Sequence, residues 1–221
     1  MNAEKNSALV PALVTLAYLA PQLAPGTPPE GAFSWLCSGM VQSASQALFL
    51  FVIIGLSGAL PEFGAGRPRS ADILRALGLF ALLAAAGLGA NGLWRATFAD
   101  PAAKAIMPAL ESQPWASAAL PAAIMGFSLA VGYREELFYR CYAIGSMVRL
   151  GARPALAGAL SVALFAAGHA YQGAAGALSA GIMGAILTAA RLKGAGVHAL
   201  AWAHAAYDAL ILFAAYGLLA P

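Results

Sequence analysis

The sequence predicts an all-α fold, a polytopic bundle of about seven transmembrane helices. Of its 221 residues, 61% are hydrophobic and only 10% are charged, and the mean hydropathy is +0.76. Soluble domains are roughly 45–50% apolar and about 25% charged. A chain of this length cannot bury so much apolar surface in a soluble core, so lipid must cover it. The net charge of +3 is small, which argues against a nucleic-acid-binding surface.

Proline, glycine and charged residues divide the chain into seven apolar segments. Residues 1–114 are expected to hold the N-terminal transmembrane helices and an interfacial loop at 95–114. Residues 115–221 are expected to hold the functional helices of the same structural domain. The expected apolar segments are approximately 7–24, 33–60, 73–94, 115–148, 154–171, 173–191 and 196–219.

The basic residues of the connecting loops predict how the bundle is oriented. With seven helices, these loops all fall on one face of the membrane, together with the N-terminus. The opposite face carries few charges, so the positive-inside rule places the N-terminus and the basic loops in the cytoplasm. The alanine-rich composition and the short loops favour a bacterial inner membrane. The basic loop residues are Arg67, Arg69, Arg75, Arg149, Arg153, Arg191 and Lys193.

A cluster of charged residues interrupts the fourth apolar segment at Arg134–Arg140. Charges at membrane depth cost at least about 2.5–3.5 kcal/mol each, so these side chains must be paired or face an aqueous cavity. Glu136 and Arg140 are four residues apart on one helix face and can form an ion pair. Glu135 projects about 100° away from Glu136, which leaves it free for another task. The alternative interpretation is a purely structural charge network.

Two later segments carry polar groups of a related kind. The fifth contains His169, and the seventh contains His204 and Asp208, four residues apart on one helix face. Counted along ideal helices from the nearest basic loop, Glu135, His169 and His204 lie at depths of roughly 21, 24 and 17 Å. The similar depths indicate one shared cavity. The alternatives are a hydrogen-bonded core histidine at His169 and an internal pair that locks the seventh helix.

Carboxyl and imidazole groups around one buried cavity suit general acid–base chemistry on water. A glutamate can take a proton from water, while histidines orient the water and stabilise an oxyanion. Hydrolysis inside the membrane is therefore the leading hypothesis from the residues alone. The same groups could instead form the proton relay of a transporter, although the sequence shows no internal repeat of the kind that transporters use. A third hypothesis is a catalytically silent binding or immunity protein in the membrane.

Three motifs resemble those of the CAAX prenyl endopeptidase and bacteriocin-processing family of intramembrane proteases, also called CPBP or Abi. The resemblance covers roughly residues 115–210 and implies that Glu135 is the general base, helped by His169. It further implies that Glu136 and Arg140 support the site, with Phe165 packed beside it. His204 and Asp208 would face the developing oxyanion. The motifs are Glu135-Glu136-x-x-x-Arg140, Phe165-x-x-x-His169 and His204-x-x-x-Asp208.

Asp208 is the position at which this sequence departs from the family pattern, because the best-understood members carry asparagine there. An amide can donate a hydrogen bond to an oxyanion, whereas an ionised carboxylate repels it. Asp208 is therefore expected to be protonated, to orient His204 or to bind a cation. No cofactor is predicted. Zinc or another divalent metal is the alternative, and its ligands would be Glu135, His169, His204 and Asp208.

The resemblance implies a substrate that is itself held in the membrane. A peptide or a lipid-modified protein fits that description, and the surrounding partners are membrane lipids. A cavity that opens toward the cytoplasm would suit a peptide tethered either by a prenyl group or by a transmembrane segment. The sequence is compatible with both tethers.

Overall fold

The structure of the protein is a computed structural model that describes residues 11–19, 31–98 and 114–218. Every regular element within these ranges is helical, which confirms the predicted all-α fold. Residues 11–19 form a short helix, η1 is a π-helix and η2 is a single 3₁₀ turn. The remaining elements are α2 (Ala32–Leu56), α3 (Ser70–Phe98), α4 (Pro114–Glu135), η1 (Glu136–Ala143), α5 (Ile144–Arg149), α6 (Pro154–Gly168), η2 (Ala170–Gln172), α7 (Gly173–Leu192) and α8 (Val197–Ala215).

Four of the described helices are long and apolar enough to cross a membrane. They are Ala32–Leu56, Ser70–Phe98, Ala170–Leu192 and Val197–Ala215, and α6 is a shorter apolar helix of 15 residues. These helices support an integral membrane protein, but the predicted count of about seven spans is not confirmed. The expected interfacial loop lies mostly outside the described residues, because α3 continues to Phe98 and the next described residue is Pro114.

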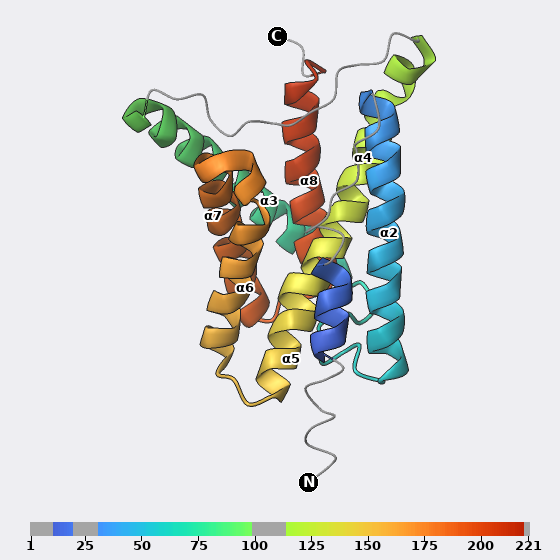
Figure 1. Cartoon of the computed structure of the whole chain (residues 1–221), viewed down its shortest axis with the longest axis vertical. Helices are drawn as coiled ribbons and strands as arrows, with labels where there is room; N and C mark the ends of the chain where they lie inside the picture. Colours follow the sequence, from blue (N-terminus) through green and yellow to red (C-terminus); the bar gives the residue numbers. More distant parts are fainter. Residues whose placement is uncertain (1–10, 20–30, 99–113, 219–221) are drawn as a thin grey trace.

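Helix α8 runs through the middle of the bundle, with α6 and α7 on one side and α2 and α4 on the other (Figure 1). Helix α4 packs against both α2 and α8, and α3 packs against α8 and α7. Glycines in the left-handed region shape two of the connections. Gly173 has a φ of 84° where η2 meets α7, and Gly194 has a φ of 91° in the turn between α7 and α8. Both conformations suit glycine, because it has no Cβ.

The contact between α4 and α8 is unusually close, because a glycine faces the neighbouring backbone. A Cβ added at Gly132 would lie 2.7 Å from the carbonyl oxygen of Ala201 and 3.3 Å from the Cβ of Ala205. Small residues allow this kind of approach between helices in a membrane. The contact lies one turn from Glu135 on α4 and one turn from His204 on α8, so it sets the distance between two parts of the predicted site.

Gly132→Val is therefore expected to destabilise the protein, because the added side chain must push α4 away from α8. Overpacking of this kind costs about 1–3 kcal/mol, and the melting temperature in detergent measures it. Gly89→Val is the matched control, since nothing lies within 4 Å of a Cβ at that exposed position of α3. Equal melting temperatures for the two variants would contradict the close contact between α4 and α8.

Candidate active site

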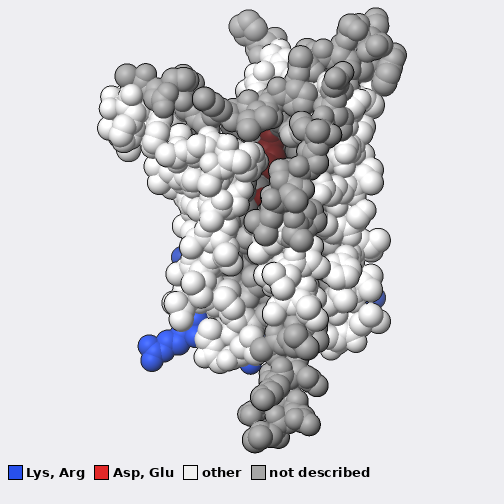
Figure 2. Space-filling model, viewed as in Figure 1, with Lys and Arg blue, Asp and Glu red and all other residues white. Residues whose placement is uncertain are grey.

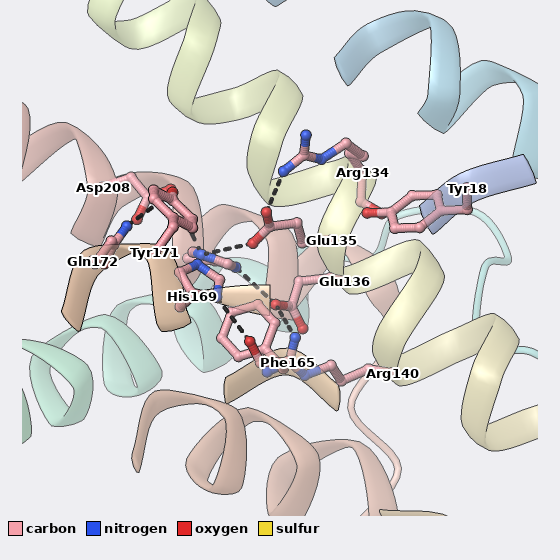
Figure 3. Close-up of polar contacts among 11 residues, drawn as sticks. Tyr18, Arg134, Glu135, Glu136, Arg140, Phe165, His169, Tyr171, Gln172 and Asp208 are labelled. Atoms are coloured by element: carbon pink, nitrogen blue, oxygen red, sulfur yellow. Dashed lines mark hydrogen bonds and ion pairs between the residues drawn. The ribbon is translucent and has the colours of Figure 1, made fainter. Parts of the chain in front are cut away.

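Three parts of the bundle bring together all seven residues that the sequence predicts for the site. All of them except His204 are labelled in Figure 3. The junction of α4 and η1 carries the charged cluster. The end of α6 carries the aromatic residue and the first histidine, and the middle of α8 carries the second histidine and the aspartate. The seven residues are Glu135, Glu136, Arg140, Phe165, His169, His204 and Asp208.

The charged cluster begins where the α-helix gives way to a π-helix. All eight residues of η1 are buried, from Glu136 to Ala143. A π-helix has a wider turn than an α-helix and is frequently found at functional sites. The fourth apolar segment, predicted as one helix over 115–148, is thus three consecutive helical pieces.

The predicted ion pair between Glu136 and Arg140 is present at the base of the site. Arg140 Nη1 lies 3.1 Å from Glu136 Oε1, and neither side chain is exposed to solvent. The guanidinium also lies over the ring of Phe165, 4.2 Å from its centroid. A cation on an aromatic face gains electrostatic attraction, so Phe165 compensates part of the cost of burying Arg140.

Glu136 has a second partner that the sequence did not predict. His204 Nδ1 lies 2.7 Å from Glu136 Oε1, and because a carboxylate accepts, the ring donates its Nδ1 hydrogen. This bond fixes the orientation of the imidazole. The opposite nitrogen, Nε2, lies 3.7 Å from Glu135 Oε2 and 3.6 Å from Asp208 Oδ2. These separations exceed a direct hydrogen bond, so Nε2 faces a space between two carboxyl groups.

His169 belongs to the same cluster of polar side chains (Figure 3). It is the first residue after α6, and its Nδ1 donates to the carbonyl oxygen of Phe165 at 2.8 Å. That bond selects the tautomer in which Nε2 is free to accept a hydrogen bond. The ring of Phe165 lies 4.5 Å from the His169 ring and 6.0 Å from the His204 ring. Phe165 therefore contacts both imidazoles and Arg140.

Two neighbours of the predicted residues were missed. The guanidinium of Arg134 forms an ion pair with Glu135 Oε1, so one oxygen of Glu135 is already engaged and only Oε2 faces His204. Tyr171 lies beyond His169 with the two ring centroids 6.3 Å apart. Their positions in the sequence could have indicated both residues. Arg134 stands directly before Glu135, and Tyr171 follows His169 by two residues.

The described residues contain no group of three histidine, cysteine or carboxylate side chains arranged to hold a metal ion. The alternative zinc ligands Glu135, His169, His204 and Asp208 are near one another but do not form such a group. The zinc alternative stays a prediction that chelation can test.

The long apolar helices and the buried charged site define an integral membrane protein with a polar centre inside its helical bundle. Residues 117–210 match the family model described as Rce1-like, type II CAAX prenyl endopeptidase Rce1-like. This match contains all seven site residues and confirms the family resemblance that the three motifs predict. Over residues 117–210 the chain is therefore similar to the CAAX-protease-like intramembrane peptidases. Comparisons with curated proteins and with solved structures gave no match.

Proposed function

We propose that the protein is an endopeptidase that hydrolyses a peptide bond of a membrane-tethered peptide or protein, with water activated by Glu135. The observation that carries this proposal is the orientation of His204. Its Nδ1 is bound to Glu136, while its Nε2 faces the space between Glu135 and Asp208. A water molecule or a substrate carbonyl placed in that space is within reach of a base and of an electrophilic group at once.

In the proposed reaction, Glu135 Oε2 takes a proton from water as the water oxygen attacks the carbonyl carbon of the scissile bond. His169 Nε2 accepts a hydrogen bond from the same water and orients it. The tetrahedral intermediate carries its negative charge on the former carbonyl oxygen. His204, as an imidazolium between carboxylates, donates its Nε2 hydrogen to that oxygen. Glu135 then gives its proton to the departing amine as the carbon–nitrogen bond breaks.

The supporting residues keep this arrangement in place. Glu136 holds the ring of His204, and Arg140 balances the charge of Glu136 in a region without solvent. Arg134 engages the other oxygen of Glu135 and so favours its ionised form, which is the form that can act as a base.

Peptide cleavage by the purified protein in nanodiscs tests the proposal. A quenched peptide library with farnesylated and plain members is incubated with the wild type, in the presence and absence of a strong chelator. Cleavage that a chelator leaves unchanged supports the glutamate mechanism. Cleavage that is lost on chelation and restored by added zinc would replace it with the metal-dependent alternative.

His169→Ala is expected to reduce cleavage by about 10²–10⁴-fold, the range of a general acid–base contribution, with an unchanged folded yield. The residue is half-buried, and within the described ranges its ring forms a hydrogen bond to a backbone carbonyl of its own helix. His198→Gln is the matched control, because that imidazole contacts Tyr133 and Gly66 instead of the site. Full activity of His169→Ala would remove His169 from the mechanism.

Asp208→Asn is expected to retain cleavage, whereas Asp208→Ala is expected to lose at least about tenfold. An asparagine amide can donate to the oxyanion at the place where the family carries asparagine, whereas alanine offers no hydrogen bond. Initial rates for both variants measure the difference. If Asp208→Asn is as inactive as Asp208→Ala, the carboxylate itself is required, either to hold His204 or to bind a cation.

A further inference from the structure

Among the described residues, the two ends of the bundle differ in charge. The loops between α2 and α3, between α5 and α6 and between α7 and α8, together with the helix ends beside them, carry seven of the twelve lysine and arginine residues of the chain. These loops lie together at one end. Figure 2 shows lysine and arginine toward that end and acidic atoms inside a hollow toward the other. The basic loop residues are Arg67, Arg69, Arg75, Arg149, Arg153, Arg191 and Lys193.

The candidate active site lies far from these basic loops. Helix α6 begins directly after Arg153 and ends directly before His169, and its 15 residues span about 22 Å. Helix α7 then returns from Gly173 to the basic end over 20 residues, or about 30 Å. Because the hydrocarbon core of a bilayer is about 30 Å thick, the turn that follows His169 lies in the half of the membrane opposite the basic loops.

Exposure of the site rises in the same direction along all three of its elements. On η1 and α4, Arg140 and Glu136 are fully buried, whereas the side chain of Arg134, farther from the basic end, is 17% exposed. The next two elements repeat the gradient. From His204 to Asp208 on α8 the exposed fraction of the side chain rises from 3% to 24%, and from Phe165 to Tyr171 the exposed fraction rises from 1% to 66%.

We propose that the site opens on the membrane face opposite the basic loops, at its Asp208 and Tyr171 end. With the basic loops in the cytoplasm, the substrate is then a membrane-anchored peptide or protein whose scissile bond lies on the non-cytoplasmic side. A lipid-modified tail in the cytoplasm would have to cross about 20 Å of packed helices to reach Glu135. The substrate assignment rests on the proposed peptidase function, but the direction of opening does not.

This direction differs from the cytoplasmic opening that the sequence suggested. Counting residues from the basic loops gives the depth of each polar group, but it does not show which end of the site is covered. The buried pair of Glu136 and Arg140 closes the end that faces the basic loops.

Cysteine labelling in intact cells tests the direction of opening without any need for catalysis. The background carries Cys37→Ala, while the fully buried Cys141 is kept. Tyr171→Cys and Lys193→Cys are introduced separately and treated with a membrane-impermeant maleimide. In intact cells, the Tyr171→Cys variant is expected to be labelled at least tenfold more than the Lys193→Cys variant. The labelling of the Lys193→Cys variant is expected to rise at least tenfold after permeabilisation. Ala170→Cys repeats the first measurement if Tyr171→Cys folds poorly.

The reverse labelling pattern would overturn the proposal, and so would a cysteine at 170 or 171 that never reacts, even in permeabilised cells. A second measurement uses a substrate with a single transmembrane anchor and two copies of a cleavable peptide, one on the cytoplasmic side and one on the non-cytoplasmic side. The Glu135→Gln variant is the inactive control. Cleavage of the non-cytoplasmic copy alone is expected, and cleavage of the cytoplasmic copy alone would overturn the substrate assignment. Expected labelling without any cleavage would keep the direction of opening and overturn the peptidase function.

Discussion

Glu135→Gln is expected to abolish peptide cleavage by the purified protein while leaving its folded yield unchanged. Glutamine keeps the size and shape of glutamate but cannot take a proton from water, so the reaction loses its general base. A positioned base contributes about 10²–10⁴-fold to the rate, and the loss should reach the upper part of that range, because Glu135 also returns the proton to the leaving amine. The initial rate at which the protein in nanodiscs cleaves the quenched peptide measures this change.

The matched control for this variant is Glu62→Gln. Glu62 is exposed, lies at the basic end and pairs loosely with Arg149 at 3.8 Å, so its replacement should leave cleavage unchanged. A Glu135→Gln protein that cleaves at the wild-type rate would show that another group activates the water. A variant that does not fold would instead show that the ion pair of Glu135 with Arg134 is structural.

Arg140→Leu is expected to cause the largest loss of stability, about 3–5 kcal/mol. The substitution removes the positive charge that compensates Glu136 in a place where neither side chain is exposed. A buried carboxylate without its partner is strongly unfavourable, and the favourable contact with the face of Phe165 is lost as well. Thermal unfolding in detergent, followed by fluorescence or by light scattering, should show a large decrease in the melting temperature.

The double variant Glu136→Gln with Arg140→Leu separates stability from activity. It leaves no unpaired buried charge, so most of the lost stability should return. Cleavage should stay low, because glutamine is a weaker acceptor for the Nδ1 hydrogen of His204. Arg149→Leu is the surface control, since an exposed pair contributes only about 0–1 kcal/mol. Equal melting temperatures for Arg140→Leu and Arg149→Leu would contradict the buried ion pair.

The sequence predicted the helices of the C-terminal half closely, because glycine and proline mark their ends. The expected segments 154–171 and 173–191 correspond to α6 with η2 and to α7, and Pro154 is the first residue of α6. The sequence did not predict the π-helix inside 115–148. The residues of η1 include no proline or glycine that would mark a change of helix type. Hydropathy does not distinguish a helix whose hydrogen bonds join residues five apart from one whose hydrogen bonds join residues four apart.

The sequence predicted only those contacts of the site that join residues close together along one helix. Four-residue spacing along one helix predicted the pair of Glu136 and Arg140, and the structure contains it. The bond from His204 to Glu136 joins residues 68 positions apart, and no local pattern encodes such a contact. The same is true of the direction in which the site opens, which depends on how three separate helices cover one another.

The π-helix between Glu136 and Ala143 also constrains the length of the chain in this region. A π-turn is equivalent to one extra residue inserted into an α-helix, so α4 and α5 differ in helical phase. Deleting any one residue between Glu135 and Ile144 would allow a continuous α-helix, but it would rotate one end relative to the other by about 100°. Either Glu135 would turn away from His204, or the apolar face of α5 would turn away from α6. A substitution in this stretch keeps the relative helical phase of α4 and α5, whereas a one-residue deletion changes it.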